Sequence, residues 1–411
     1  MTVHLRHLCL LPLAALATSA ALFAQPPAAE EAESFAQALK QGKTSLQLRY
    51  RYENVSQDSF LKDAHASTLR TTLGYATRPY KGLSFKLEAE NVAALGNDLY
   101  NNRGAGSDDN GVRDRPVVAD PELTELNQAF LRFERGDTEL TLGRREIVLG
   151  DVRYLGNVGW RQHHQSFDAF TFTNTTLAHT TLKYGYIDKV HRIFGDTQPM
   201  SSHFLNSTVT IGGVGTVTLY GYLLDYDRPQ DAGRSSSTYG VELKGGREIG
   251  SGGAKLLYEL EAADQSDAGD NPGRIDAGYV YAVLGAELSS VTVKAGWERL
   301  DGSARDGQFN TPLATLHAWN GWADLFLATP RNGLEDLSLS LAGKVGKVAW
   351  TAIYHDFTAA TGSADYGSEL DLQLTLKAPW NQVFGLKAAL YNADTFASDT
   401  DKLMFWTTYG F

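Results

Sequence analysis

Apolar and polar residues alternate with a period of two along most of the chain. The segment SLQLRYRYE (45–53) places leucines and tyrosines on one face of an extended chain and polar side chains on the other. The segment SELDLQLTLKA (368–378) alternates in the same way. This pattern predicts β-strands with one apolar face. Taken alone, it fits both a half-solvated soluble sheet and a transmembrane barrel.

The pattern predicts about 18 such strands. They lie near residues 44–54, 67–77, 83–92, 125–135, 138–148, 165–175, 179–189, 202–212, 215–226, 236–247, 253–263, 276–288, 291–301, 334–344, 347–358, 366–378, 383–393 and 402–411. An even number of strands would leave both ends of the barrel chain on the same side of a membrane.

The connections between these strands distinguish the two sheet types. Tight turns such as RPYKG, GGVG and KVG alternate strictly with long connections. The long connections include 93–124, 149–164, 190–201, 227–235, 264–275 and 302–333. Short periplasmic turns and long extracellular loops are typical of outer-membrane barrels. We therefore predict an all-β fold: a single closed antiparallel transmembrane β-barrel. The strand-like segment 318–328 is expected inside the last long loop, folded into the pore.

The two ends of the chain support this interpretation. Residues 1–24 have a basic start and an apolar run, which predict a secretory signal peptide; a membrane anchor is the alternative. Residues 25–43 would be a short periplasmic segment, and 44–411 the barrel. The final strand places Leu403 and Phe411 on one apolar face. We expect that face to meet outer-membrane lipid and the strand to pair with the first strand, since lipid cannot satisfy an open edge.

Composition narrows the functional class. The formal net charge is −11, which argues against nucleic-acid binding. The only cysteine, Cys9, lies in the predicted signal peptide, so disulfides, thiol catalysis and cysteine zinc sites are not expected in the mature chain. Mean hydropathy is −0.27, and no apolar run beyond the signal reaches the length of a transmembrane helix. Alternating strands can still cross a membrane at this hydropathy.

Two long motifs add a family resemblance. The segments LTLGRREIVLGDVRYLGNVGWRQHHQSFDAF (140–170) and HAWNGWADLFLATPRNGLEDL (317–337) look like the alginate-export family of bacterial outer-membrane channels. The resemblance runs from about residue 38 to the C-terminus. It implies a monomeric barrel with a positively charged constriction for a polyanionic sugar, without implying alginate itself. The aromatic final residue resembles the signal read by the barrel-assembly machinery, which is therefore an expected partner.

A barrel of this size leaves an aqueous lumen, and its inward side chains set selectivity. Alternation assigns ten inward side chains to the substrate path: Arg49, Arg51, Arg70, Lys86, Glu88, Glu90, Gln128, Arg132, Glu134 and Arg145. Arg144 shares its phase with the lipid-facing Leu142, which makes Arg145 the better inward candidate. Arginine offers bidentate donors to carboxylates, so these arginines would guide an acidic solute. The alternative is that the charges pair with each other and serve structure.

We therefore expect an outer-membrane channel of a Gram-negative bacterium. It would give passive, anion-selective passage to a polar or acidic (poly)saccharide or a small organic solute. A general diffusion porin without polyanion specificity is the main alternative. A barrel-embedded hydrolase and a secreted all-β binding protein are further alternatives. The direction of transport stays open.

Residues for catalysis or metal binding are scarce in the pattern. No G-x-S-x-G nucleophile motif is present, and we expect no enzyme activity. His163, His164 and Asp168 resemble a metal cluster, but neighbouring residues of a strand point to opposite faces. The segment SDDNGVRD (107–114) has oxygens suited to calcium but lacks EF-hand spacing. We expect no cofactor and no bound metal, with peripheral calcium at 107–114 as the alternative.

Overall fold

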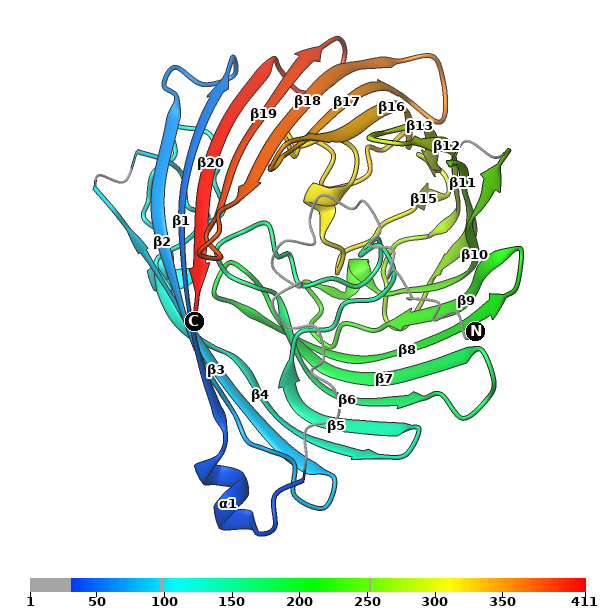
Figure 1. The fold of residues 1–411 in the computed structure, drawn as a ribbon. Helices are drawn as coiled ribbons and strands as arrows, with labels where there is room; N and C mark the ends of the chain where they lie inside the picture. The colour runs from blue at the N-terminus through cyan, green and yellow to red at the C-terminus, as the bar shows by residue number, and fades with distance from the viewer. Residues whose placement is uncertain (1–30, 97–98, 251–252) are drawn as a thin grey trace.

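The computed structural model describes residues 31–96, 99–250 and 253–411, and 18 of its strands form one closed antiparallel sheet (Figure 1). The predicted signal peptide and its cysteine lie outside the described residues. The strands are β1 (Lys43–Gln57), β2 (Ala64–Ala76), β3 (Leu83–Ala94), β4 (Leu123–Arg135), β5 (Thr138–Arg145), β6 (Ser166–Asn174), β7 (Thr180–His191), β8 (Thr197–Ile211), β9 (Gly215–Leu224), β10 (Ser236–Ile249), β11 (Ala254–Asp267), β12 (Asp276–Leu288), β13 (Val291–Leu300), β16 (Leu334–Val345), β17 (Val348–Thr358), β18 (Asp365–Lys377), β19 (Val383–Ala393) and β20 (Thr400–Gly410). The predicted all-β barrel is confirmed.

The barrel closes between its first and last strands. β1 and β20 pair antiparallel from Gln47 opposite Gly410 to Gln57 opposite Thr400. Phe411 continues the ladder, because its N–H donates to the carbonyl of Leu46 at 2.9 Å. In Figure 1 the red β20 runs beside the blue β1. Closure pairs the backbone groups that a membrane could not hydrogen-bond.

The outer face of the sheet carries a band of leucines. On β16, Leu337, Leu339 and Leu341 are exposed, and β18 exposes its leucines at alternate positions in the same way. Inward neighbours of the last strand, such as Met404 and Trp406, are buried. The two faces thus differ as the alternation predicts. Lipid would cover the leucine band in the membrane.

The connections alternate between short and long, but several long ones are shorter than expected. The predicted loop 190–201 is mostly strand, since β7 ends at His191 and β8 begins at Thr197. The predicted loop 264–275 shrinks to residues 268–275 because β11 extends to Asp267. The strands continue past the apolar band with polar residues on both faces, so hydrophobic alternation ends before the backbone pairing does.

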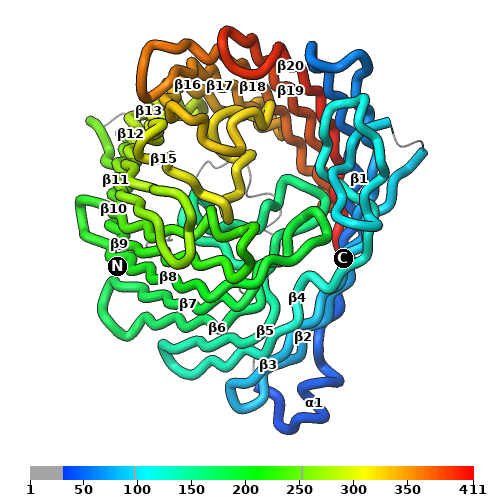
Figure 2. Tube along the Cα trace, turned by 180° about the vertical axis from the view of Figure 1, so that it is seen from behind, coloured from blue at the N-terminus to red at the C-terminus, as the bar shows by residue number. Residues whose placement is uncertain are grey.

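Three long connections matter for the lumen. We call residues 95–122 loop A, 146–165 loop B and 301–333 loop C. Figures 1 and 2 show loop C, in yellow, inside the ring of strands. It contains the short strands β14 (Gly302–Ser303) and β15 (Gly307–Gln308), and residues 318–328 form no strand, as predicted.

Side chains of loops B and C build a packed interior. Trp160 of loop B and Trp322 and Phe326 of loop C are buried in one apolar cluster with the barrel wall. Tyr100 of loop A is buried with Val55, which lies near the C-terminal end of β1. Before β1, the short helix α1 (Phe35–Lys40) is capped by the side chain of Ser34. No helix in the described part of the chain is long and apolar enough to cross a membrane.

Candidate functional site in the barrel lumen

Three predicted arginines of β1 and β2 hold the backbone of loop B. Arg49 donates to the carbonyls of Trp160 and Arg161, both at 2.9 Å, and to that of Gly159 at 3.3 Å. Arg51 donates to the carbonyl of Trp160 at 2.9 Å, and Arg70 donates to that of Gln162 at 3.0 Å. Four consecutive carbonyls (159–162) are therefore bound by guanidinium groups.

These arginines are also shielded from solvent and paired with acids. Their exposed fractions are 4% for Arg49, 1% for Arg51 and 1% for Arg70. Arg51 pairs with Glu53 on its own strand and lies 3.3 Å from Asp120 of loop A. In this conformation the three side chains face inward, but they lie behind loop B and do not line an open path.

Loop C is held by carboxylates that bind its backbone N–H groups, on the other side of the β1–β20 closure. The backbone N–H of Trp322 donates to Asp371 at 3.1 Å, and that of Ala323 donates to Glu369 at 2.7 Å; both acids are buried on β18. Gly321 has a φ of +85°, and a Cβ there would come within 2.3 Å of Glu369. This contact requires glycine in the NGWAD segment.

Loops B and C are fastened to each other. Arg161 of loop B contacts Asp324 of loop C at 2.7 Å, and Lys402 of β20 contacts the same carboxylate at 2.9 Å. Arg161 also lies 3.3 Å from Glu53 of β1. Burial opposes the ionisation of Asp324, but His317, Lys402 and Arg161 outweigh it and hold its pKa well below its usual range. The network ties both loops to the closing seam of the barrel.

His317 of loop C lies between loop B, loop C and the barrel wall. Its ring stacks on Trp160 with centroids 4.5 Å apart. Nδ1 lies 2.7 Å from Asp324, and Nε2 lies 3.0 Å from the ammonium of Lys387. Lysine can only donate, so Nε2 accepts and the proton is on Nδ1, facing Asp324. Burial lowers the pKa of His317 to about 3, and Lys387 and Arg161 act in the same direction. The imidazole is therefore neutral at physiological pH.

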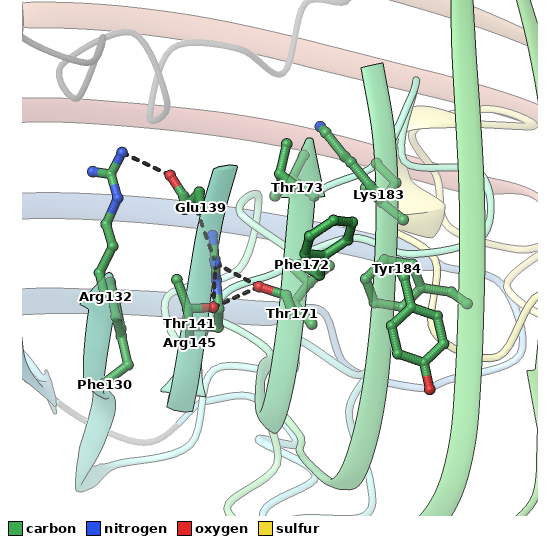
Figure 3. A pocket seen from close by; sticks show the side chains of 14 residues that line it. Phe130, Arg132, Glu139, Thr141, Arg145, Thr171, Phe172, Thr173, Lys183 and Tyr184 are labelled. Carbon is green, nitrogen blue, oxygen red and sulfur yellow. Dashed lines mark hydrogen bonds and ion pairs between the residues drawn. The ribbon is translucent and has the colours of Figure 1, made fainter. Parts of the chain in front are cut away.

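A second group of predicted residues lines an accessible recess. The recess has a volume of about 350 Å³, and its lining includes Arg132, Arg145 and Lys183 with one carboxylate, Glu139 (Figure 3). Arg132 lies 2.6 Å from Glu139, and Arg145 donates to Thr141 at 2.7 Å. The charges of the lining sum to 3 − 1 = +2. This wall can attract an anion from the aqueous lumen.

The wall formed by β10 and β11 has the opposite character. It carries the inward carboxylates Glu242, Glu259 and Glu261, with Lys244 among them. Lys244 contacts Asp151 of loop B and lies 3.0 Å from Glu259. The described lumen thus has a basic wall on β4–β7 and an acidic wall on β10–β11.

The remaining predicted residues also lie on the inner face, within polar networks. Lys86 lies 3.0 Å from Glu88, and Gln128 donates to Glu88 at 2.8 Å. Glu90 lies 2.6 Å from Nδ1 of His164, and Glu134 lies 2.9 Å from Arg132. The structure therefore divides the ten predicted residues among the clamp on loop B, the recess and these networks.

Arg144 shows how the phase of β5 is resolved. It pairs with Asp168 of β6 at 2.8 Å, and its neighbour Leu142 on the same face is 62% exposed. Arg145, one residue later, lines the recess. Asp168 therefore lies on the outer face with Arg144. It does not point into the lumen as a metal ligand beside His163 and His164 would.

Sequence reasoning missed several residues of the lumen. Lys183 could have been found, since it lies between the apolar Leu182 and Tyr184 in a strand. Glu125 could not, because β3 and β4 shift register between Glu88 and Ala89 and the shift leaves Asn127 as the extra residue of β4. A bulge of this kind reverses which residues face inward.

The segment predicted as a peripheral calcium alternative is held by cations of the protein. In loop A, Asp109 pairs with Arg113, and Asp114 lies 2.6 Å from Lys62 of the β1–β2 connection. These pairs occupy acidic oxygens that a calcium ion would need. Nothing in this segment draws its carboxylates to one point.

Structural comparison relates the fold to solved channels. OpdK of Pseudomonas aeruginosa, solved with vanillate, matches with a TM-score of 0.71 and 16% identity, covering 91% of this chain and 99% of that one. OccK9 (OpdG) of the same organism gives 0.71 and 17% over the same shares. OccAB4 of Acinetobacter baumannii gives 0.71 and 14%, covering 90% and 98%. At these identities the likeness shows the shared fold. Among curated proteins, none matches the chain.

A family model described as alginate export matches residues 42–299. The match includes the 140–170 motif and ends before the NGWAD motif. It spans well over half of the chain. The chain therefore belongs to the alginate-export family of bacterial outer-membrane β-barrel channels.

Proposed function

We propose that this channel gives passive, anion-selective passage to polar or acidic solutes, either acidic saccharides or small organic acids. The observation that carries the proposal is the recess on the inner face of β4–β7, where Arg132, Arg145 and Lys183 outnumber Glu139. Two of its three cations were expected from strand alternation alone.

The distribution of charge across the lumen supports selectivity. The basic recess lies on one part of the wall, and Glu242, Glu259 and Glu261 lie on another. A polar solute between oppositely charged walls experiences a field across the pore, and a narrow low-dielectric passage focuses it. Guanidinium groups on the basic side match the geometry of a carboxylate.

The arginines behind loop B also support a preference for anions. Arg49 and Arg70 give most of their bonds to neutral carbonyls or amides, so part of their positive charge is not cancelled by ion pairs. If loop B moves, these side chains become available to an anionic solute. The position of loop B would therefore determine the width of the lumen and the number of arginines that a solute can reach.

The membrane setting supplies the other partners of this proposal. The protein would be a monomer whose exposed leucine band contacts outer-membrane lipid. Its last strand, followed by Phe411, would engage the barrel-assembly machinery. The signal peptide ending at Ala24 stays a prediction of the same proposal.

The test is single-channel recording in a planar bilayer with a salt gradient, on wild type and on Arg132→Ala/Arg145→Ala. The matched control is Arg144→Ala, which removes an arginine of the same strand from the outer face. We expect the reversal potential to move toward cation selectivity in the double variant and to stay unchanged in the control.

The outcomes separate the two candidate functions. Anion selectivity that collapses in the double variant supports the proposal, and uronic-acid oligomers and small carboxylates would then be compared as blockers. Cation selectivity in the wild type, or equal reversal potentials in all three proteins, would show a general diffusion porin whose arginines serve structure.

A further inference from the structure

His163 of loop B is fully buried in an unusual polar setting. Its Nε2 lies 3.2 Å from the carbonyl of Pro121 in loop A. A carbonyl accepts only, so this contact requires a proton on Nε2. A neutral ring then has a lone pair on Nδ1. That atom is buried and has no hydrogen-bond partner among the described residues, although it lies 3.0 Å from Oε1 of Glu125.

Two carboxylates surround this nitrogen. Glu90 comes from β3, Glu125 comes from β4, and one donor atom from each lies within 4.8 Å of the others and of His163. Oε1 of Glu125 also lacks a hydrogen-bond partner. Glu90 directs Oε1 to His164, while Oε2 accepts from the backbone N–H of His164 at 3.2 Å and keeps a further lone pair.

We propose that Glu90, Glu125 and His163 form a binding site for a divalent transition metal ion, with zinc as its chemical type. Imidazole nitrogen and carboxylate oxygen are both zinc ligands, and three protein ligands leave the fourth position to water. A ligating histidine usually donates its other ring N–H to a carbonyl or carboxylate, as His163 is placed to do with Pro121. Calcium is disfavoured because it takes oxygen ligands.

One pair of donor atoms already lies near the spacing that zinc needs, and Glu90 lies within 4.8 Å of that pair. Two ligands about 2.0 Å from a tetrahedral zinc ion are about 3.3 Å apart. Nδ1 of His163 and Oε1 of Glu125 already lie 3.0 Å apart. The sequence pattern predicts no bound metal, and it indicates only His163, His164 and Asp168 as a histidine-containing cluster. The proposed site shares only His163 with that group.

A cluster on another part of the wall, at β10 and β11, shows what an acidic group looks like when the protein supplies the cation. Asp151, Glu242 and Glu259 also bring three oxygens together, but the ammonium of Lys244 lies among them, 3.0 Å from Glu259. At His163 the corresponding position holds two unpartnered polar atoms. The competing account is an imidazolium form of His163 that donates to both Pro121 and Glu125.

A bound ion would join loop B to β3 and β4. The adjacent Gln162 is already tied to β2 through Thr68 at 2.9 Å and to loop A through Asp120 at 2.9 Å. The metal would add a third attachment at the same part of the loop. It would hold loop B in the inward position that narrows the lumen, so zinc would also reduce fluctuations of the open-channel current.

The test is zinc titration by calorimetry on tag-free, chelator-treated protein in detergent micelles. The variants are His163→Ala and Glu125→Gln. The matched control is His203→Ala, which removes a half-buried histidine that bonds Tyr184 on β7. We expect one tight site in the wild type and the control, weakened at least ~10-fold in both site variants, in line with the loss seen when zinc-site residues are changed.

An anomalous-difference map from zinc-soaked wild-type crystals gives an independent answer if a variant does not fold. A peak between Nδ1 of His163 and the two carboxylates supports the site. The proposal is overturned if zinc binds the wild type more weakly than ~10 μM, or if His163→Ala binds it as tightly as the wild type. It is also overturned if the peak lies elsewhere, as with surface histidines; His163 is then an imidazolium paired with Glu125.

Discussion

The arginines of β1 and β2 and those of β4 and β5 follow the same sequence rule and end in different environments. Arg51 is 1% exposed and donates to a loop carbonyl, whereas Arg132 and Arg145 border an open recess. All of them occupy inward phases of their strands. The difference comes from loop B: its residues 159–162 lie against the arginines of the first pair of strands, whereas its residues 147–149 only line the recess at the second pair. An inward position in a barrel therefore does not specify contact with the solute.

The comparison assigns different jobs to one residue type. Buried guanidinium groups on β1 and β2 bind the backbone of loop B, and partly exposed ones on β4 and β5 line the recess. On β18, Glu369 and Asp371 serve loop C as the arginines serve loop B, by binding backbone N–H groups. The arginines of β1 and β2 bind backbone carbonyl oxygens, and the carboxylates of β18 bind backbone N–H groups.

The largest effect should come from removing a buried arginine. Arg51→Ala removes the buried cation that Glu53 and Asp120 share, and leaves Glu53 with Arg161 at 3.3 Å. Breaking a buried pair in this way costs about 3–5 kcal/mol of folding stability. Denaturant unfolding of the detergent-solubilised barrel measures it. Arg132→Ala is the matched comparison and should cost less than ~1 kcal/mol, since its pairs are partly exposed. Equal losses in the two variants would contradict the division of roles.

The next effect concerns selectivity. Arg145→Glu reverses one charge of the recess and leaves the arginines that hold residues 159–162 of loop B unchanged. A unit charge a few ångströms from a passing ion contributes about 1 kcal/mol in water. We therefore expect the anion-to-cation permeability ratio to fall about fivefold or more, measured from reversal potentials, with single-channel conductance close to wild type. A large rise in conductance instead would mean that Arg145 supports the loops.

A smaller effect should appear in the pH dependence of stability. The pKa of His317 is about 3 in the folded chain, below its ordinary value of about 6.5. The unfolded chain therefore binds a proton first as pH falls, so stability is fully present above about 6.5 and declines below it. The loss is about 1.4 kcal/mol for each pH unit below that value.

The measurement compares His317→Gln with wild type at pH 7.5 and 5.5. The charged groups that face His317 are Asp324 of loop C, Lys387 of β19 and Arg161 of loop B. They are common to both proteins, so the difference between the two pH profiles isolates the imidazole. Wild type should lose more melting temperature on acidification than the variant. Parallel profiles would show that the pKa of His317 is the same in the folded and the unfolded chain.

The smallest effect is expected on loop A. Arg113 pairs with Asp109 four residues earlier, on the exposed part of the loop. Exposed pairs of this kind contribute little to stability because water screens them. Arg113→Ala should leave the melting temperature and the conductance unchanged. A shift in either would mean that loop A acts on the lumen through this segment.

Much of the fold was predictable because alternation reports directly on the two faces of a barrel wall. The 18 strands followed from it. The closure between β1 and β20 followed from the need to pair every edge in lipid, and the even strand count favoured placing residues 318–328 inside loop C. The choice of Arg145 over Arg144 followed as well, from the phase of Leu142. These features depend on local periodicity, which is written in neighbouring residues.

The partners of the inward charges were decided by tertiary structure alone. The carbonyls of residues 159–162 meet Arg49, Arg51 and Arg70 only because loop B folds back across more than 90 residues of sequence. Glu125 joins His163 only because a bulge in β4 reverses its phase. Within a regular strand, the sequence by itself determined which side chains face the lumen, since a strand repeats every two residues. Loop packing and the register shift in β4, which have no short repeat, decided which of them are covered by loop backbone and which border the recess.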